Sequence, residues 1–451
     1  MKLSILGGGG FRVPYVYQAL LRDRGTPRIE EVSLYDVDTG RLDSMTRVLA
    51  ELAQGHPDAP KVTATTVLDD AVHGSDFVFA AIRVGGLVGR TCDERVALDL
   101  DVLGQETTGP GGIAYGLRTV PVMLDIARRV RELAPHAWVI NFTNPAGMIT
   151  EAMQTVLGDR VLGICDTPSG MGRRLAGALG VDPGQVEFDY VGLNHLGWMR
   201  AVRHEGRDLL PGLLADDAAL GALEEGMVFG REWLRDLGLI PNEYLYYYYF
   251  TRDAVRAVVD AGRTRGEFLV EQQTAFFDRL ARETGPGAVG LWRQTVAGRS
   301  ASYMAEAKGG AHPGPADGQD DEPQDDGYAR VAVGVMAAIA RNEPARMILN
   351  VRNGTTVAAL PEDAVVEVPV TVDAAGVHPL RVAPPDLHQA GLMQQVKAVE
   401  RLTISAAATG SPTDAVKAFA LHPLVDSVTV GRALFEGYTR RIPQVGAVFK
   451  R

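Results

Sequence analysis

The sequence predicts an α/β protein with an N-terminal doubly wound parallel sheet and a C-terminal mixed α+β domain. In the first third of the chain, short apolar runs alternate with segments of helical spacing, which is typical of βαβ units. From about residue 186, longer helical segments are expected, with further strands near 347–351 and 364–372. The chain has 451 residues, of which 46% are hydrophobic and 22% charged, enough for two sizeable cores.

The individual elements follow from these runs and their spacing. Strands are expected at 3–6, 32–35, 77–82, 138–142 and 160–164, and helices at 13–22 and 41–52. We place the domain boundary so that the first domain covers residues 1–185 and the second covers residues 186–451. Residues 309–327 hold glycine, proline and acidic residues without an aliphatic core former, which predicts a disordered acidic loop.

Charge and composition exclude several classes of partner. Lys and Arg number 45 against 56 Asp and Glu, a net charge of −11, which argues against nucleic acid or an anionic membrane as the main partner. No apolar run reaches membrane-spanning length, and the N-terminus lacks the pattern of a signal peptide. The only cysteines, Cys92 and Cys165, cannot form a disulfide framework. A soluble, cytoplasmic protein is expected.

A glycine loop follows the first expected strand. Gly7, Gly8, Gly9 and Gly10 lead into a helix, the context in which backbone N–H groups and a helix N-terminus bind a pyrophosphate. Asp36 ends the second strand, where a carboxylate accepts hydrogen bonds from an adenosine ribose and repels a 2′-phosphate. Together they predict a Rossmann-like domain that prefers NAD to NADP. A tight turn and an ordinary turn aspartate are the alternatives, since the third glycine of the usual motif is missing.

A cysteine, a histidine and an asparagine are candidates for further chemistry. Cys165 follows a strand and precedes Asp166, and His195 lies among glycines and aliphatic residues. Each could be an ordinary core residue. Together they are too few for a structural zinc site, but they suit a catalytic metal site that leaves positions for substrate oxygens or water. Asn144 precedes a proline at the end of another strand, where a turn is the alternative.

Six motifs in one order resemble a known family. They are GGGG at 7–10, RVGG at 83–86 with the charged residues that follow it, GQETTG at 104–109, NFTNPAG at 141–147, GICDTP at 163–168 and GLNHLGW at 192–198. Together they resemble family 4 of the glycoside hydrolases, the NAD- and manganese-dependent 6-phospho-glycosidases. The resemblance runs from residue 1 to about 255, and continues more weakly at 350–354 and 422–424.

The resemblance implies a redox route to hydrolysis, an exception to the two-carboxylate scheme of most glycosidases. NAD+ oxidises the C3 hydroxyl, a base removes the acidified C2 proton, and the glycosidic oxygen is eliminated from C1. Water then adds and the hydride returns to C3. A divalent metal stabilises the enediolate as a Lewis acid. The resemblance implies Mn²⁺, although a thiolate ligand also suits iron, cobalt or nickel.

The resemblance also assigns roles to residues near the reacting carbons. It implies Cys165 and His195 as metal ligands and Asn144 as a neighbour of substrate and nicotinamide. In P-N-E-Y-L-Y-Y-Y at 241–248 it places the base at Tyr244, with Tyr246 and Tyr247 as the alternatives. Nearby positive charge is expected to lower the pKa of this phenol. Asp166 matches the proposed general acid of α-specific members.

Two arginines are expected to bind the substrate. Arg83 matches a substrate-binding arginine, and Arg299, before S-A-S-Y at 300–303, is the nearest candidate for the arginine that binds the 6-phosphate. The chain departs from the family at Phe11 and Arg12, where relatives commonly have other residues after the glycines.

The predicted function is therefore hydrolysis of 6-phospho-glucosides, with 6-phospho-β-glucosides preferred. The expected substrate is a phosphorylated glucoside or disaccharide, and the chain is expected to form a homodimer or homotetramer through its second domain. Three alternatives remain: a 6-phospho-α-glucosidase of the same family, an NAD-dependent dehydrogenase of the malate or lactate type with the same architecture, and a non-catalytic NAD-sensing protein.

Overall fold

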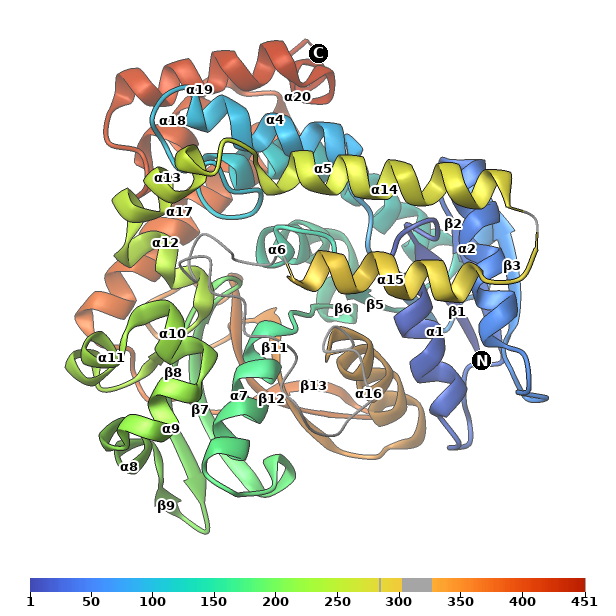
Figure 1. Ribbon diagram of the computed structural model, residues 1–451, viewed down its shortest axis with the longest axis horizontal. Coiled ribbons are helices and arrows are strands. Elements are labelled where there is room, and N and C mark those ends of the chain that lie inside the picture. The colour runs from blue at the N-terminus through green and yellow to red at the C-terminus, as the bar shows by residue number, and fades with distance from the viewer. Residues whose placement is uncertain (284, 302–326, 451) are drawn as a thin grey trace.

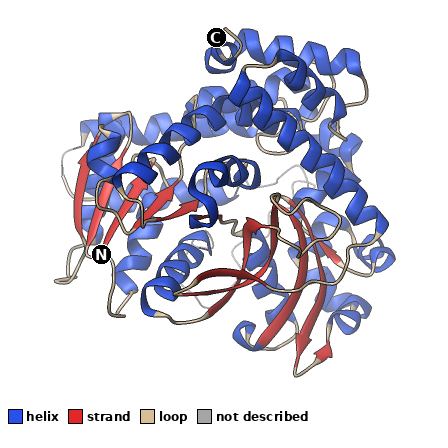
Figure 2. Ribbon diagram, turned by 180° about the vertical axis from the view of Figure 1, so that it is seen from behind, coloured by secondary structure: helices blue, strands red, loops and turns tan. Residues whose placement is uncertain are grey.

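A computed structural model describes residues 1–283, 285–301 and 327–450. In these ranges thirteen strands form one sheet, with helices packed on both faces (Figures 1 and 2). The strand order is β10-β8-β7-β12-β11-β6-β5-β4-β1-β2-β3, with β9 beside β8 and β13 beside β12. The strands are β1 (Lys2–Leu6), β2 (Glu31–Tyr35), β3 (Lys61–Thr65), β4 (Phe77–Ala80), β5 (Trp138–Asn141), β6 (Val161–Gly163), β7 (Val186–Leu193), β8 (Leu196–His204), β9 (Arg207–Asp208), β10 (Ile240–Pro241), β11 (Ala345–Arg352), β12 (Val365–Asp373) and β13 (Gly376–Pro379).

The N-terminal half is the predicted doubly wound sheet. Strand β1 pairs in parallel with β2 and β4, and the pairs β2–β3, β4–β5 and β5–β6 are parallel as well. The resulting order 3-2-1-4-5-6 is the Rossmann arrangement, in which ligands bind at the carboxyl ends of the strands. The helices of this half are α1 (Val13–Arg22), α2 (Thr39–Leu52), α3 (Leu68–Val72), α4 (Gly86–Leu98), α5 (Pro110–Leu133), α6 (Ala146–Leu157), the 3-10 turn η1 (Gly158–Arg160) and α7 (Thr167–Ala178).

The five expected strands and the two helices of this half are present, with ends shifted by one or two residues. Central strand β4 is buried throughout, as expected for a parallel strand covered on both faces. Strand β3 was missed. It lies at the sheet edge, and its sequence K-V-T-A-T alternates polar and small residues without an apolar run.

The second half corrects one prediction. Longer helices were expected from about residue 186, but β7 and β8 form an antiparallel hairpin there. The alternation of buried and more exposed residues in V-E-F-D-Y at 186–190 is typical of a strand. The expected strands near 347–351 and 364–372 are β11 and β12, an antiparallel pair.

The remaining helices surround this second part of the sheet. They are η2 (Pro183–Gln185), α8 (Leu210–Ala215), α9 (Asp217–Ala222), α10 (Glu224–Phe229), α11 (Arg231–Leu237), η3 (Glu243–Leu245), α12 (Tyr246–Tyr249), α13 (Thr251–Asp260), α14 (Arg265–Arg282), α15 (Ala288–Ala301), α16 (Gly327–Arg341), α17 (Leu387–Thr409), α18 (Pro412–Leu421), α19 (Val428–Arg441) and α20 (Pro443–Val448). The boundary at residue 185 stays a prediction. Residues 309–326 of the predicted acidic loop lie outside the described residues, whereas Gly327 begins α16 and is buried.

The parallel strands and the antiparallel strands of the sheet are joined along one row of residues, which we call the seam. Asn350 of β11 is the residue that pairs with β6, opposite Gly163. Glu367 of β12 is the residue that pairs with β7, opposite Gly192. Because Asn350 and Glu367 also pair with each other, these four residues lie in one row across four neighbouring strands. This row lies close to the ends of β6 and β7, where Cys165 and His195 follow.

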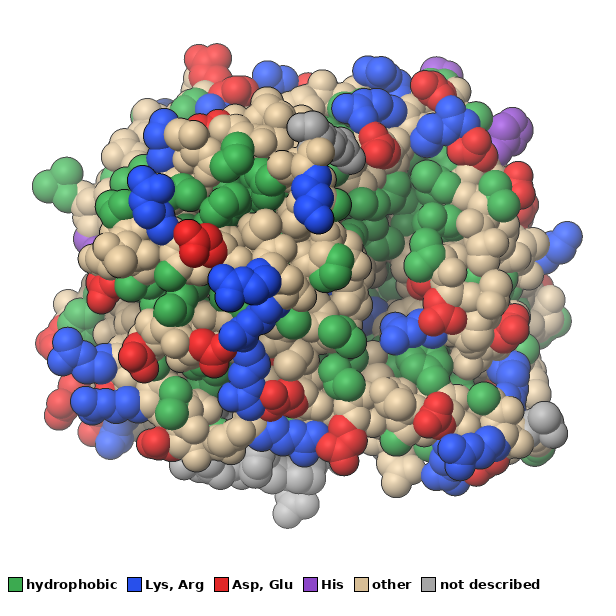
Figure 3. All heavy atoms as spheres, turned by 90° about the horizontal axis from the view of Figure 1, so that it is seen from above, with side chains coloured by type: hydrophobic (Ala, Val, Ile, Leu, Met, Phe, Trp, Pro, Cys, Tyr) green, Lys and Arg blue, Asp and Glu red, His purple; other side chains and the backbone are tan. Residues whose placement is uncertain are grey.

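The surface has no large single-sign area on the face that carries α14 and α20. Figure 3 shows acidic and basic side chains interspersed there, with apolar side chains in the hollows between them. Within the described ranges, every helix is too short or too polar to span a bilayer.

Candidate active site

The glycine loop between β1 and α1 has no room for side chains. A Cβ on Gly7 would lie 2.5 Å from the carbonyl oxygen of Ala81, and a Cβ on Gly8 would lie 2.7 Å from the Cβ of Leu34. Gly7 also has φ +90°, a conformation that glycine favours. The loop therefore presents bare backbone at the N-terminus of α1, as a bound pyrophosphate requires.

Asp36 lies at the end of β2, as predicted, beside this loop. Its Oδ2 accepts a hydrogen bond of 3.0 Å from the backbone N–H of Gly9, and its Oδ1 accepts one of 3.2 Å from Asp38 N–H. Each carboxylate oxygen has a second lone pair. The side chain therefore holds the loop and retains acceptor capacity for a ribose.

Arginine side chains gather around one half-buried carboxylate near the end of β4. Glu106 forms ion pairs of 2.6 Å with Arg83 and 2.7 Å with Arg90. Burial alone would raise the pKa of Glu106, but the charges of Arg83 and Arg90, with a smaller effect of Arg299, lower it to about 2. The predicted residues Arg83 and Arg299 are thus brought to one cluster. Glu106 and Arg90 lie within motifs that the sequence pointed to, but neither was singled out.

Cys165 is buried at the end of β6, with its Sγ 4.0 Å from Oδ1 of Asp166. Burial raises the pKa of its thiol well above the ordinary value, and the charges of Glu367 and Asp166 raise it further. A nearby cation has the opposite effect and stabilises a thiolate.

His195 lies in the tight turn between β7 and β8. Its φ is +62°, a left-handed conformation that non-glycine residues rarely adopt. Its ring is buried and stacks on the ring of Tyr244, with centroids 3.8 Å apart and planes within 11°. Burial lowers the pKa of His195 to about 4 despite the charge of Glu106. The imidazole is therefore neutral near pH 7, as a metal ligand must be.

Tyr244 differs from its two neighbours in exposure. It is half-buried on η3, whereas Tyr246 and Tyr247 are 7% and 2% exposed. Oε1 of the adjacent Glu243 accepts a hydrogen bond of 3.3 Å from the hydroxyl of Thr167, on the helix that follows Cys165. Tyr244 therefore lies against His195, its neighbour Glu243 contacts the helix that follows Cys165, and a substrate has better access to Tyr244 than to the two alternatives.

Asn144 lies in the β5–α6 loop, and its Oδ1 is buried without a hydrogen-bond partner among the described residues. A buried carbonyl oxygen without a partner is costly, so this atom fits a site that a ligand completes. The side chain of Asn194, next to His195, accepts a hydrogen bond of 3.1 Å from the backbone N–H of Ala146 at the start of α6. This contact holds the His195 turn next to the loop of Asn144.

Asp166 immediately precedes α7 and lies near Arg12, which immediately precedes α1. Oδ2 of Asp166 lies 4.0 Å from Nη1 of Arg12. The Arg12 guanidinium lies between two aromatic rings, 4.8 Å from the centroid of Phe142 and 4.6 Å from that of Tyr328. Arg12, a residue at which the chain departs from the family pattern, thus contacts Asp166, the predicted general acid.

A buried carboxylate that the sequence did not single out lies beneath these residues. Glu367 accepts hydrogen bonds of 2.8 Å from Tyr190, 2.8 Å from Asn350 and 3.4 Å from Asn194. Burial raises its pKa to about 7, and its hydrogen bonds reduce that effect. A single acidic residue inside the apolar run V-V-E-V-P-V is the sequence feature that could have indicated it.

The donor set of Cys165 and His195 fits a partly closed cation site. Among the described residues, no group of three or more His, Cys, Asp or Glu is arranged to hold a metal. A thiolate and an imidazole suit a transition metal and leave its other positions to substrate oxygens and water.

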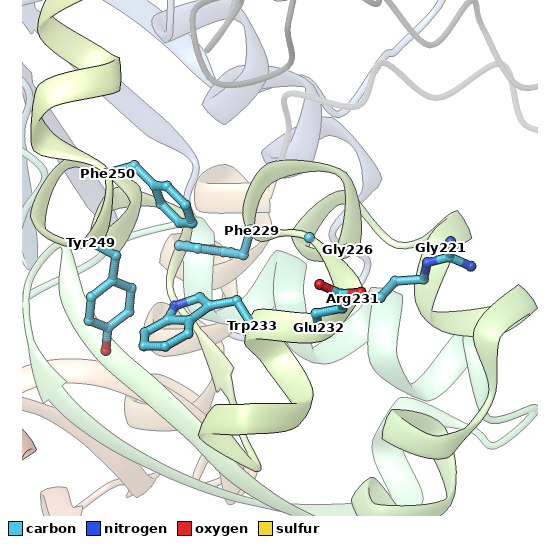
Figure 4. A pocket seen from close by; sticks show the side chains of 9 residues that line it. Gly221, Gly226, Phe229, Arg231, Glu232, Trp233, Tyr249 and Phe250 are labelled. Carbon is cyan, nitrogen blue, oxygen red and sulfur yellow. The ribbon is translucent and has the colours of Figure 1, made fainter.

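A separate cavity of about 790 Å³ lies among α9–α12. Its walls include Phe229, Trp233, Tyr249 and Phe250, whose rings face one another in Figure 4. No predicted site residue lines it. We therefore place the chemistry at the seam, where the strand-end residues converge.

A dinucleotide-type loop, a buried thiol at the end of β6, a neutral imidazole in the β7–β8 turn and an arginine cluster define a Rossmann-type enzyme. Family models assign it further: the family 4 glycosyl hydrolase model matches residues 2–181, and that of its C-terminal domain matches residues 190–425. The chain belongs to the family 4 glycosyl hydrolases, as the motifs predicted, and so to a glycosidase family and not to the malate or lactate dehydrogenases.

Relatives named as 6-phospho-α-glucosidases and relatives named as 6-phospho-β-glucosidases both match nearly the whole chain. A probable 6-phospho-β-glucosidase of Bacillus subtilis is 30% identical and covers 97% of this chain and 95% of that protein. A maltose-6′-phosphate glucosidase of the same organism is 31% identical, with 96% and 94% covered. The 6-phospho-β-glucosidase of Thermotoga maritima, solved with NAD and glucose-6-phosphate, superposes with a TM-score of 0.84 at 26% identity over 99% of both chains. A 6-phospho-α-glucosidase from gut microorganisms, solved with NAD and Mn²⁺, gives a TM-score of 0.80 at 26% identity over 97% of both chains.

Proposed function

We propose that this chain hydrolyses 6-phospho-glucosides, preferring the β-anomer, by oxidation at C3, removal of the C2 proton and elimination of the aglycone. The observation that supports the proposal is the stacking of His195 on Tyr244 at a turn held by Asn194 to Glu367, the carboxylate whose charge also acts on Cys165. The relatives solved with NAD, Mn²⁺ and glucose-6-phosphate support NAD and a divalent cation as cofactors and a phosphorylated sugar as substrate.

Separate residues would hold the two cofactors. Gly7 to Gly10 and Asp36 hold the dinucleotide, and Cys165 and His195 hold the cation. When bound, NAD accepts and returns the hydride at C3, while the cation withdraws electron density from the C3 oxygen and so acidifies the C2 proton.

The side chains of this chain position the sugar and transfer its protons. Arg299 binds the 6-phosphate, because a guanidinium group matches a dianion, and Arg83 also binds the substrate. Asn144 binds a sugar hydroxyl or the nicotinamide amide through its free Oδ1. The phenolate of Tyr244 takes the proton from C2 as the bond from C1 to the glycosidic oxygen breaks.

A specific observation favours the α-anomer as the second candidate. Asp166 follows Cys165 in the pattern of α-specific members, and its side chain is one-third exposed at the site. A carboxyl group there can protonate a leaving oxygen on that face of the ring. Asp166→Asn separates the two: it should greatly reduce turnover of an α-linked substrate and change that of a β-linked one much less.

The test of the reaction itself is isotopic. The α- and β-linked 6-phospho-glucosides, and the same glucosides without phosphate, are incubated with the chain, NAD and Mn²⁺ in D₂O. We expect hydrolysis of the phosphorylated β-glucoside and deuterium at C2 of the product, because elimination breaks the C2–H bond. Product without deuterium would refute the redox route. Tight NAD binding without turnover or exchange would favour the NAD-sensing alternative.

Tyr244→Phe tests the base. General-base assistance contributes about a hundred- to ten-thousand-fold in rate, so the variant should lose activity on that scale and keep NAD binding. The matched control is Tyr247→Phe, because Tyr247 lies in the same tyrosine-rich segment and its ring is buried. Loss of activity in the control alone would move the base to Tyr247.

A further inference from the structure

The conformation of His195 needs a structural explanation. A non-glycine residue in the left-handed region is strained, and it persists only where its surroundings fix it. The turn offers few constraints of its own, since only Asn194 and His195 lie between β7 and β8. The stack on Tyr244 constrains the ring of His195, but the backbone requires another anchor.

That anchor is the side chain of Asn194. Its Oδ1 accepts the N–H of Ala146, and its Nδ2 donates to Oε1 of Glu367 at 3.4 Å. Gly147 provides the space, because a Cβ there would lie 3.2 Å from the Cβ of Asn194. Asn194 is thus hydrogen-bonded to α6 on one side and to β12 on the other.

Glu367 is itself rigidly held. It is 1% exposed, and its other hydrogen bonds, from Tyr190 and Asn350, are both 2.8 Å. Its backbone pairs with Gly192, three residues before His195. Glu367 is therefore connected to the turn in two ways. Its backbone pairs with β7, the strand that leads into the turn, and its carboxylate accepts a hydrogen bond from the side chain of Asn194.

We propose that Glu367 is a positioning residue that holds the His195 turn in the geometry needed to bind the cation. This inference rests on the proposed function, in which His195 is a metal ligand. A neutral amide in place of the carboxylate accepts more weakly from Asn194, so the strained backbone can relax and move the imidazole. Groups that orient a metal ligand from behind typically contribute ten- to a hundredfold to metal affinity.

The test measures Mn²⁺ affinity by calorimetry on the full chain saturated with NAD, together with NAD affinity and thermal unfolding. We expect Glu367→Gln and Asn194→Ala each to weaken Mn²⁺ binding about ten- to a hundredfold while NAD affinity is retained. The double variant should bind Mn²⁺ no more weakly than the poorer single variant, because both changes act on the same hydrogen bond between Asn194 and Glu367.

The matched control is Glu151→Gln. Glu151 is another buried carboxylate near the seam, where it accepts the N–H of Val365 and pairs with Lys397, but it contacts neither Asn194 nor His195. It should lower thermal stability and leave Mn²⁺ affinity unchanged. Equal losses of Mn²⁺ affinity in Glu151→Gln and Glu367→Gln would show a merely structural role and overturn the inference.

His195→Asn separates the inference from the function beneath it. Asparagine tolerates the left-handed conformation, so this variant should fold and lose Mn²⁺ binding. If it loses Mn²⁺ while Glu367→Gln binds normally, the positioning role is wrong and the metal site stands. If it binds Mn²⁺ as the parent chain does, both the metal site and the role of Glu367 are refuted.

Discussion

His422 should make the folded chain less stable as the pH falls below about 6.5. The side chain is 4% exposed, and its Nδ1 accepts a hydrogen bond of 3.1 Å from the backbone N–H of Leu424. Burial lowers its pKa from 6.5 to about 3. Between these two values the unfolded chain binds a proton at this histidine and the folded chain does not. Stability is therefore full above pH 6.5 and is lost as the pH falls toward 3.

The size of the effect follows from the shift. Each pKa unit corresponds to about 1.4 kcal/mol, so His422 should remove roughly 2–3 kcal/mol between pH 6.5 and 4.5. His422→Asn keeps an acceptor for Leu424 N–H, because Oδ1 of asparagine occupies the place of Nδ1, but it does not titrate. The variant should be less stable than the parent at pH 7, and the difference should shrink by about 1.4 kcal/mol for each pH unit below 6.5.

Urea unfolding at intervals from pH 7.5 to 4.5 measures both slopes. The matched control is His136→Asn, since His136 is exposed. Parallel stability curves for the parent and His422→Asn across this range would refute the reasoning, because they would mean that His422 stays neutral in the unfolded chain or becomes charged in the folded one.

Three other predictions concern the site. Gly7→Ala places a Cβ 2.5 Å from the oxygen of Ala81, so calorimetry should find NAD affinity reduced at least tenfold; normal affinity would mean that the loop does not bind the dinucleotide. Asp36→Ala should raise the affinity for NADP relative to NAD, and an unchanged ratio would reduce Asp36 to a support of the loop. Cys165→Ser should weaken Mn²⁺ binding and nearly abolish turnover while circular dichroism stays the same. Full activity after metal removal and re-addition would exclude Cys165 as a ligand.

The sequence predicted the parallel half of the fold better than the antiparallel half. Buried parallel strands such as β4 are short apolar runs, and their spacing from helices determines the architecture. The edge strand β3 has no such run, and β7 begins with alternating buried and more exposed residues before its apolar end. Their pairing depends on neighbours that are distant in the chain.

The site residues likewise divide into those that the local sequence predicts and those that it does not. Residues such as Asp36, Arg83 and Cys165 could be predicted because they follow strands whose carboxyl ends meet at one edge. Glu106 and Glu367 were not singled out, because their importance lies in contacts with distant segments. Glu367 acts beside Asn194, which is 173 residues away in sequence. Local spacing contains no information about such a contact.

The seam at Asn350 and Glu367 has a consequence for how the chain unfolds. One residue pair joins β6 to β11 and one joins β12 to β7, so the parallel strands and the β7–β8 hairpin share little backbone hydrogen bonding. Cys165 belongs to the parallel part and His195 to the hairpin on the other side, so a cation held by both would act as a cross-link between them. Its binding free energy would then enter the free energy of unfolding. Chelators should accordingly broaden the thermal transition or split it in two, and saturating metal should sharpen it.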